Sequence, residues 1–373
     1  MTRVAREAGA INLAQGFPDF PAPEVLKEAA CDAIRADVNQ YAVTWGTPRL
    51  RQALAAKYAR DYGLNVDEAT EITVTCGATE AMAAALLAVV DPGDEVIIFE
   101  PFYENYGPDA ILCEASPVWV PLDATGPLDI DRIRAAVSAR TRAIIINSPN
   151  NPTGRVFDRT ELDALAGVCL DHDLIAFTDE IYEHITYGVD HVPIATLDGM
   201  RDRTVTISGF SKTFSVTGWR VGTIVAPADI TLAIRKVHDF LTVGAPAPLQ
   251  EACAAALESL HADYYHGLAR DYRARRDVLV TGLQEAGFRC SDPAGAYYVL
   301  ADFSSLSDLN DIAFSKWLAR GGNAGAPGVA PVPGSSFFHD PGLGRSLVRF
   351  AFCKRIETLR TAAGRLVRIL HDG

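Results

Sequence analysis

The sequence lacks paired cysteines and clustered histidines, and the spacing of these residues fits neither a disulfide framework nor a zinc site. Its 373 residues include seven cysteines, scattered along the chain without a C-x-x-C pair, and eight histidines. The nearest histidines, His184 with His191 and His261 with His266, lack the context of a zinc finger. We therefore expect free thiols, no bound metal and a cytoplasmic location, where thiols stay reduced.

Long apolar segments and an excess of positive charge are also missing. The longest apolar run, residues 81–90, is far short of the roughly 20 residues that span a membrane, and the opening MTRVAREAGA lacks the apolar stretch of a signal peptide. Lys and Arg number 34 against 47 Asp and Glu, which gives a net charge of −13. A surface of that sign repels phosphate backbones. We expect a soluble protein that binds neither membranes nor nucleic acid.

The common motifs of several enzyme classes are absent as well. There is no Walker A loop, no G-x-G-x-x-G after a strand, no H-E-x-x-H and no G-x-S-x-G. Ser208 and Lys212 lie too far apart for the S-x-x-K motif of β-lactamases. These absences argue against nucleotide binding by those routes, zinc proteolysis and serine hydrolysis.

What the sequence does contain is an alternation of short β-branched runs and helical stretches between about residues 70 and 225. This alternation predicts an α/β domain with a mainly parallel sheet. Beyond Gly287, a strand, a helix, a Gly/Pro-rich loop at 321–334, a strand and a final helix predict a smaller α+β domain. The strands expected in the first domain are 72–75, 95–99, 118–120, 143–147, 174–178, 204–208 and 221–226.

Polar residues follow several of these strands at their carboxyl ends, where open α/β sheets bind ligands. They are NNPTG at 150–154, Asp179, the pair Lys212 and Arg220, and the turn at 76–79, whose free N–H groups suit an anion. Each has a plainer interpretation by itself: a turn, a helix cap, a surface lysine or an ordinary strand-to-helix connection.

Together these groups match the needs of one cofactor. A lysine flanked by small residues suits an imine with an aldehyde, and a nearby arginine suits a phosphate. A carboxylate at a separate strand end keeps a pyridine nitrogen protonated, so that the ring accepts electrons. An asparagine amide can donate to a phenolic oxygen on the same ring. This is the set of groups that pyridoxal 5'-phosphate requires.

Seven motifs occur in one order along essentially the whole chain: NLAQGFPDFPAP, NQYAVTWGTPRLR, EPFYENY, NSPNNPTG, TDEIYEH, SKTFSVTGWRVG and LVRFAFCK. In these motifs the sequence resembles the class I and II aminotransferases of fold type I. The resemblance is strongest to the group of kynurenine aminotransferase, glutamine transaminase K and methionine aminotransferase. It implies a large domain with a mainly parallel seven-stranded sheet, a smaller α+β domain, and a homodimer.

The resemblance implies a role for each residue at a matching motif position. Lys212 would form the imine with the cofactor and move a proton between the substrate Cα and the cofactor C4′. Asp179 would pair with the pyridine nitrogen, and Tyr103 would stack on the ring unless it is a core aromatic. Asn151 and Tyr182 would hydrogen-bond the phenolic oxygen, with Asn151 also beside the substrate.

The resemblance also implies a phosphate site, built from Arg220, the N–H groups of Ala78 and Thr79, and Tyr41 of a second subunit. Many relatives place a phosphate-binding serine three residues before the lysine, where this chain has Gly209. Serines flank that position on both sides. Ser208 is our candidate for the role, and Ser211 is the alternative.

For the substrate, Arg349 matches the arginine that binds the α-carboxylate in a bidentate fork. Gly16 would lie close to that carboxylate, where a side chain would intrude. Trp45, Phe17 and Phe20 either line a pocket for an uncharged, often aromatic or sulfur-containing side chain or pack in the core.

We therefore predict a ping-pong aminotransferase that moves an amino group from an L-amino acid to a 2-oxo acid. N-acyl-diaminopimelate or aspartate aminotransferase is the main alternative, and an acidic side chain would need a second arginine, which Arg49 or Arg355 could supply. A cysteine-conjugate β-lyase on the same fold is another. A non-catalytic sensor module of a transcription regulator would need a helix-turn-helix domain and would tend to lose Lys212 or Arg349, and both are present.

The length and the order of the motifs predict three segments. An N-terminal segment, 1–38, joins the small domain; a large cofactor domain covers 39–269; and a small C-terminal domain covers 270–373. Within an acidic protein, Lys212 and two arginines should form a local cationic pocket. Because the resemblance implies that Tyr41 reaches a second subunit, the site should be complete only in a dimer.

Overall fold

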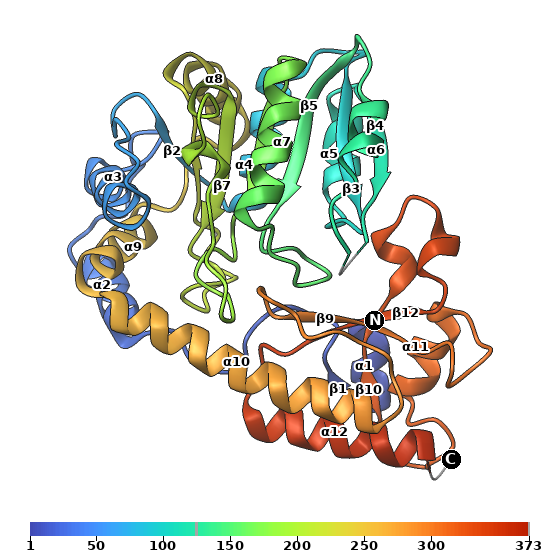
Figure 1. Cartoon of the computed structure of the whole chain (residues 1–373). Coiled ribbons are helices and arrows are strands. Elements are labelled where there is room, and N and C mark those ends of the chain that lie inside the picture. The colour runs from blue at the N-terminus through green and yellow to red at the C-terminus, as the bar shows by residue number, and fades with distance from the viewer. Residues whose placement is uncertain (124–125, 372–373) are drawn as a thin grey trace.

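The computed structural model describes residues 1–123 and 126–371. Within them the chain forms a large body around a seven-stranded sheet and a smaller body around a three-stranded sheet. Figure 1 shows the smaller body below the large sheet, across the ends of its strands, with the long helix α10 (Ala262–Glu285) running towards it from α9. The first and the last described helices both lie in the smaller body.

The large sheet has the strand order β2-β8-β7-β6-β5-β3-β4. Neighbouring strands are parallel except that β8 is antiparallel to both β2 and β7. The strands are β2 (Ile72–Thr75), β3 (Glu95–Glu100), β4 (Ser116–Pro121), β5 (Thr141–Asn147), β6 (Ile175–Asp179), β7 (Thr204–Gly209) and β8 (Gly222–Val225). Each predicted strand is present to within a few residues, and the α/β class with a mainly parallel seven-stranded sheet is confirmed.

Helices cover both faces of this sheet, which explains why its central strands are apolar along their whole length. Ile145 of β5 belongs to the core on one face, and its neighbours Ile144 and Ile146 belong to the core on the other. The first core includes α4 (Ala78–Val89), α5 (Tyr106–Leu112) and α8 (Ala228–Thr242), and the second includes α6 (Ile130–Ala136) and α7 (Arg159–Asp171).

Three further helices form a third core against β2 and β8 at one side of the sheet. They are α2 (Glu24–Arg35), α3 (Pro48–Tyr62) and α9 (Ala247–Ser259). Both α2 and α3 pack against α9. Since α2 falls within the predicted segment 1–38, that segment contacts the large body as well as the small one.

The smaller body has an antiparallel sheet in the order β11-β12-β9. Helix α10 packs against the last helix, α12, and the N-terminal strand β1 pairs in parallel with β10. The elements are α1 (Thr2–Ala8), β1 (Ile11–Asn12), β9 (Tyr298–Asp302), α11 (Asp311–Ala319), β10 (Val329–Ala330), β11 (Val332–Pro333), β12 (Leu347–Ala351) and α12 (Ile356–His371).

Short 3₁₀ helices occur in both bodies, at Ile194–Thr196 and Arg201–Arg203 between β6 and β7, and at Gly334–Phe337 and Pro341–Gly344 between β11 and β12.

The loop at 321–334 differs from its prediction. It contains the two short strands β10 and β11, because its backbone pairs with β1 on one side and with β12 on the other. Two-residue strands have no hydrophobic period that a sequence could reveal.

The domain boundaries at 38 and 270 stay predictions, and the second one lies inside the continuous helix α10. Residues 372–373 of the predicted last segment lie outside the described residues. None of the described helices is both long and apolar enough to cross a membrane.

Candidate active site

Lys212 lies in the turns that connect β7 to β8, beside the carboxyl ends of the parallel strands. Its Nζ is 3.4 Å from the carbonyl oxygen of Gly16 and lies 5.9 Å and 5.8 Å from the ring centres of Tyr182 and Tyr297. Burial lowers the pKa of Lys212 to about 8, although Asp179 acts in the opposite direction. Lys212 is therefore an enclosed amine that loses its proton far more easily than a surface lysine does.

Asp179 is the last residue of β6, and its carboxylate is buried. Its Oδ2 accepts a hydrogen bond of 2.7 Å from the Tyr106 hydroxyl, and its Oδ1 accepts one of 3.3 Å from the backbone N–H of Ile181. Burial raises the pKa of Asp179 above its ordinary value, while these two hydrogen bonds oppose the rise. No α-helix begins directly after Asp179, so helix capping does not explain it. A buried carboxylate of this kind is best balanced by a cationic N–H group.

Two asparagines of the NSPNNPTG motif link the ends of β5 and β6. Asn147 donates from its side chain to the carbonyl oxygen of Asp179 at 2.9 Å, and its Oδ1 accepts from the backbone N–H of Asn151 at 2.8 Å. The Oδ1 of Asn151 accepts a hydrogen bond of 2.7 Å from Arg349. With this oxygen bound, the NH₂ group of Asn151 is the part of the side chain that can donate to a ligand.

Arg349 on β12 brings a cation to the site from the smaller body. Besides Asn151, its guanidinium donates to the carbonyl oxygen of Ala14 at 2.9 Å and lies 4.2 Å from the ring centre of Tyr298. Arg349 is buried, and among the described residues its Nε has no hydrogen-bond partner. A buried guanidinium N–H without a partner is suited to an incoming carboxylate.

The turn from β2 into α4 meets Arg220 at a third part of the site. Gly77 caps α4 with a φ of 89°, and a side chain there would overlap the Arg220 guanidinium. Arg220 donates to the Thr79 hydroxyl at 3.4 Å and to the carbonyl oxygen of Thr217 at 3.1 Å. The first N–H groups of α4 have no intrahelical acceptor. A guanidinium beside such N–H groups is suited to hold a phosphate.

Lys212, Asp179 and Arg220 line one cavity, and Arg349 lies beside it, in contact with the lining residues Asn151 and Tyr298. Tyr103 lies on the cavity wall, and its ring meets that of Tyr106 edge to face at 5.6 Å between ring centres. The lining residues that the sequence predicted are Ala78, Thr79, Tyr103, Asn151, Asp179, Tyr182, Lys212 and Arg220. The others are Met82, Asn105, Tyr106, Asp109, Asn147, Ile181, Ser211 and Tyr298.

Ser208 lies away from this cavity, in contrast to the prediction. Its hydroxyl donates to Oε1 of Glu183 at 2.7 Å, and it is Ser211 that lines the cavity. Successive side chains of β7 point to opposite faces of the sheet, and the spacing to the lysine does not reveal which face Ser208 takes.

Tyr41, Trp45 and Gly16 do not line the cavity either. Tyr41 is 88% exposed in its own chain, and Trp45 packs on Arg235 at 5.0 Å, outside the cavity. Gly16 does approach the site, since its carbonyl oxygen accepts from Lys212. A side chain at Gly16 would overlap the hydroxyl of Tyr298. The absence of a side chain therefore makes room for Tyr298, and not for the substrate carboxylate as predicted.

Sequence reasoning missed several cavity residues. Tyr106 and Tyr298 are buried aromatics, and a buried tyrosine in a motif looks the same whether it packs or hydrogen-bonds. For Tyr106 a signal existed, because it closes the EPFYENY motif that also contains Tyr103. Asn147 is the polar residue that ends the apolar strand AIIIN. Its position at the carboxyl end of a strand is the signal that could have identified it.

The residues present fit pyridoxal 5'-phosphate. Lys212 is an amine for its aldehyde, and Asp179 is a buried carboxylate for its pyridine nitrogen. Arg220 and the glycine-shaped turn at Gly77 suit its phosphate. The unpaired Nε of Arg349 then remains for a second anion, the substrate carboxylate.

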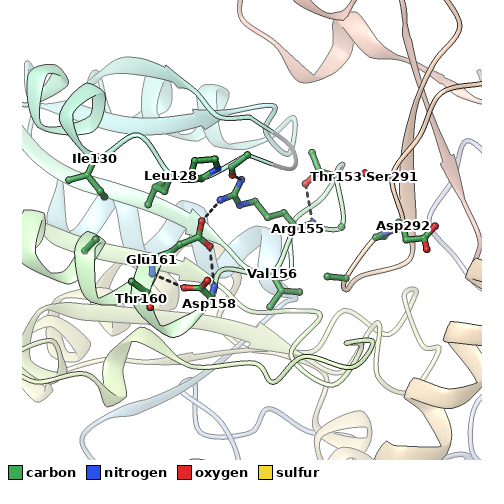
Figure 2. Close-up of a pocket in the computed structure, with 16 residues that line it drawn as sticks. Leu128, Ile130, Thr153, Arg155, Val156, Asp158, Thr160, Glu161, Ser291 and Asp292 are labelled. Atoms are coloured by element: carbon green, nitrogen blue, oxygen red, sulfur yellow. Dashed lines mark hydrogen bonds and ion pairs between the residues drawn. The ribbon is translucent and has the colours of Figure 1, made fainter.

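A second, wider pocket lies between the start of α7 and residues 291–294 (Figure 2). Arg155 contacts Glu161 there and donates to the carbonyl oxygens of Asp123 at 2.6 Å and Gly126 at 2.7 Å. Asp158 and Glu161 cap α7. Because the charged groups beside α7 are bound to one another, we assign no chemistry to this pocket.

Comparison with known sequences agrees with this geometry. Residues 8–366 match the profile of the family described as Aminotransferase class I and II. The probable N-succinyldiaminopimelate aminotransferase DapC of Mycobacterium tuberculosis is 43% identical, over 98% of this chain and 94% of that protein. The methionine aminotransferase of Escherichia coli is 39% identical over 98% of this chain and 94% of that protein, and kynurenine–oxoglutarate transaminase 1 of Homo sapiens is 34% identical over 96% and 92%.

Solved structures give the same result. N-succinyldiaminopimelate aminotransferase from M. tuberculosis has a TM-score of 0.94 at 43% identity, over 99% of this chain and 96% of that one. Aspartate aminotransferase from Thermus thermophilus has a TM-score of 0.90 at 34% identity, over 99% and 96%. The predicted fold type I, the predicted transaminase activity and the dependence on pyridoxal phosphate are confirmed. The chain belongs to the class I and II aminotransferases.

Proposed function

We propose that this aminotransferase takes the amino group of L-amino acids with an uncharged side chain, often aromatic or sulfur-containing, and gives it to a 2-oxo acid. The observation that carries this proposal is the number of cations at the cavity. Arg220 is assigned to the phosphate and Arg349 to the α-carboxylate. Among the described residues, Lys212 and Arg220 are the cations that line the cavity, and Arg349 lies beside it, bound to the lining residue Asn151, so no further cation is left for an acidic side chain.

The two arginines that could have served an acidic substrate lie elsewhere. Arg49 donates to Glu251 at 3.1 Å and to Glu258 at 2.6 Å, so its charge is already paired on the surface. Arg355 is exposed, and its backbone N–H is bound by Asp19. Neither lines the cavity.

The roles of the residues follow from their surroundings. Pyridoxal 5'-phosphate, when bound, supplies an aldehyde for the amino group and a ring that accepts electrons. Lys212 holds the aldehyde and then, as an amine with a pKa of about 8, takes the proton from the substrate Cα. Asp179 keeps a proton on the pyridine nitrogen, and Tyr182 donates to the phenolic oxygen. Arg349 and Asn151 orient the α-carboxylate.

A second candidate is N-succinyldiaminopimelate aminotransferase. It is favoured by the 43% identity to the M. tuberculosis protein of that name, against 39% to the methionine enzyme of E. coli. Its substrate carries additional carboxylates, which would have to bind beyond the described cavity or at a partner subunit.

The test is a panel of amino donors with 2-oxoglutarate and with 2-oxo-4-methylthiobutanoate as acceptors. We expect kcat/KM for methionine, phenylalanine and kynurenine to exceed that for aspartate and N-succinyl-diaminopimelate by roughly 10-fold or more. A higher value for N-succinyl-diaminopimelate would establish the second candidate instead. Stoichiometric pyruvate and ammonia from a cysteine conjugate without any 2-oxo acid would indicate a β-lyase.

We also propose that the working unit is a homodimer in which Tyr41 completes the phosphate site of the partner. Tyr41 and Phe240 are 88% and 91% exposed, which is unusual for aromatic side chains. The loop with Tyr41 lies beside the end of α8, since His238 of α8 hydrogen-bonds the carbonyl oxygen of Thr44 at 2.8 Å. A second copy of this chain would cover such an apolar surface.

Mixed dimers test this arrangement. Lys212→Ala and Tyr41→Ala subunits should each be weakly active alone. After unfolding and refolding together, one site of each mixed dimer carries neither substitution, so activity should return to about a quarter of the wild-type value. A monomer in sedimentation analysis, or no recovery on mixing, would contradict the shared site.

The unpaired state of all seven cysteines supports a further proposal, that the protein works in a reducing compartment such as the cytoplasm. The four cysteines Cys113, Cys169, Cys253 and Cys353 are buried.

A further inference from the structure

Tyr298 lies between the residues assigned to the cofactor and the arginine assigned to the substrate. It is the first residue of β9 in the smaller body, its side chain is buried, and it lines the cavity. We propose that Tyr298 is a positioning residue that strengthens the hydrogen bond from Tyr182 to the phenolic oxygen of the cofactor. The inference rests on the proposed role of Tyr182.

The contact between the two tyrosines is specific. Their hydroxyl oxygens are 3.1 Å apart, and their rings meet edge to face at 5.9 Å between centres. Within the part of the chain that the structure describes, Tyr182 is the only residue that hydrogen-bonds the Tyr298 side chain. Buried hydroxyl groups need partners, so the Tyr298 hydroxyl is committed to Tyr182.

The protein holds the Tyr298 ring in place. The Arg349 guanidinium lies over it at 4.2 Å from the ring centre, and the ring of Tyr297 lies at 4.9 Å. Gly16 makes room for the hydroxyl, which would overlap any side chain at that position. The hydroxyl of Tyr298 therefore has a fixed position next to Tyr182, at low entropic cost.

A phenol has one proton to donate. In the structure the Tyr182 hydroxyl donates to the Tyr298 oxygen. If Tyr182 gives its proton to a ligand oxygen instead, its own oxygen becomes an acceptor, and the Tyr298 hydroxyl can turn to donate to it, since a hydroxyl both donates and accepts. A hydrogen bond received by the Tyr182 oxygen polarises its O–H group and makes it a stronger donor, since successive hydrogen bonds reinforce one another in a site of low dielectric constant.

Both tyrosines keep their protons in the range where an enzyme is assayed. Burial raises the pKa of Tyr298 to about 12, although Arg349 opposes the rise. Burial also holds the pKa of Tyr182 well above its ordinary value. The other titratable groups that face Tyr298 are Cys353 on the chain after β12 and Tyr103 on the cavity wall.

The measurable consequence is a shift in the visible spectrum of the cofactor-loaded protein. The nitrogen that would join Lys212 to the cofactor titrates beside the phenolic oxygen. Hydrogen-bond donors to the phenolic oxygen stabilise the negative charge of that oxygen, and they do so most when the nitrogen is neutral. Removing the Tyr298 hydroxyl should therefore raise the pH midpoint of the absorbance change, by roughly 0.5 pH unit.

The experiment compares the absorbance midpoints of wild type, Tyr298→Phe, Tyr182→Phe and the double variant. Tyr182→Phe should raise the midpoint more than Tyr298→Phe, and the double variant should match Tyr182→Phe alone, because Tyr298 acts through Tyr182. Tyr187→Phe is the matched control: its buried hydroxyl contacts the carbonyl oxygen of Ala296, which holds the same segment but faces no cofactor group.

Each outcome is decisive. Equal midpoints for Tyr298→Phe and wild type would overturn the inference while leaving the proposed function intact. Equal shifts for Tyr298→Phe and Tyr187→Phe would show a purely structural effect and would also overturn it. Additive shifts in the double variant would show that Tyr298 acts independently of Tyr182. If Tyr182→Phe itself left the midpoint unchanged, the role proposed for Tyr182 would fall and the inference with it.

Discussion

Asp179, Lys212 and Arg349 differ in how completely the protein pairs their charges. Asp179 accepts hydrogen bonds from two donors, Lys212 has only a carbonyl oxygen at 3.4 Å, and the Nε of Arg349 has no partner among the described residues. Burial of charged groups costs free energy that their partners offset. The incompletely paired groups are those to which a ligand brings the missing partner.

Lys212 leads to a prediction about pH. Because burial lowers its pKa from 10.5 to about 8, the neutral amine that attacks an aldehyde becomes common at mildly alkaline pH. The rate at which cofactor-free protein binds pyridoxal phosphate should rise with pH through a midpoint near that value. Stopped-flow absorbance measures this rate, with Lys212→Ala as the control that shows no such phase. A midpoint near the ordinary lysine value would show that the amine is not perturbed.

Tyr106 leads to a prediction about activity. Its hydroxyl donates to the buried Asp179 carboxylate at 2.7 Å, and hydrogen bonds to charged groups contribute about 1.5–3 kcal/mol. Tyr106→Phe should raise the pKa of Asp179 further and lower kcat/KM by roughly 10-fold to 100-fold. Steady-state kinetics would test this, and unchanged kcat/KM would mean that the hydrogen bond from Ile181 suffices.

At the scale of single residues, the sequence predicted the charged groups of the cavity together with Tyr103 and Tyr182, and it missed Tyr106 and Tyr298. Lys212, Asp179 and Arg220 lie at strand ends, where charge has few structural explanations. Tyr106 and Tyr298 differ from core tyrosines only in the direction of a hydroxyl group, which three-dimensional packing decides.

Helix α3 and the ends of β6 and β7 are joined behind the cavity by a buried ion pair. Lys57 of α3 lies 2.5 Å from Glu183, which also accepts hydrogen bonds from Ser208 of β7 and from Tyr62. Burial alone would raise the pKa of Glu183, but Lys57 and the hydrogen bonds outweigh burial and hold that pKa far below its ordinary value. The pair therefore fixes α3 against the two strands that lead to Asp179 and Lys212.

The buried pair predicts a large loss of stability when one partner is removed. Lys57→Met should lower the free energy of unfolding by about 3–5 kcal/mol, since Glu183 would stay charged without its cation or take up a proton. The folded-state pKa of Glu183 is depressed, so its contribution is present above the unfolded pKa and is lost as pH falls through the folded value.

Urea unfolding at neutral and at acidic pH measures both effects. The wild type should lose stability with falling pH, and Lys57→Met should lose less because part of the linkage is gone. The double variant Lys57→Met with Glu183→Leu is the control and should recover part of the loss. Identical unfolding curves for Lys57→Met and wild type would contradict the structural role of the pair.

At the scale of elements, strand positions were predictable because β-branched, apolar runs identify buried parallel strands. The face to which Ser208 points was not, since motif spacing gives no side-chain direction. The pairings of β1 with β10 and of β11 with β12 were also hidden, because they join segments far apart in the sequence through backbone atoms alone.

At the scale of the whole molecule, the site forms where the N-terminal segment and the two bodies meet. Asn151 of the large body binds Arg349 of the smaller body, and Arg349 binds Ala14 near the N-terminus. The N-terminal segment is fastened to the last helix by Asp19, which accepts from the Arg355 backbone N–H at 2.5 Å and from the Thr358 hydroxyl at 3.0 Å.

Asp19 leads to the prediction at this scale. Asp19→Ala should remove these two hydrogen bonds at the start of α12 and lower the free energy of unfolding by about 1–2 kcal/mol. It should also raise KM for amino donors, because the segment with Ala14 and Gly16 would be held less firmly beside the site. Asp19→Asn, which keeps an acceptor oxygen, should lose less. Thermal unfolding and steady-state kinetics measure the two effects. An unchanged KM would show that Asp19 stabilises the fold without positioning the N-terminal segment beside the site.

The contacts of Arg349 with Ala14 and Asn151 have an entropic consequence. A free arginine side chain gives up about 2 kcal/mol of rotational freedom when it is immobilised. In this protein that loss occurs on folding, since two contacts already fix the guanidinium before any substrate arrives. If Arg349 binds the substrate carboxylate as proposed, the substrate meets a side chain that is already ordered, and more of its binding free energy remains to orient its Cα for proton transfer.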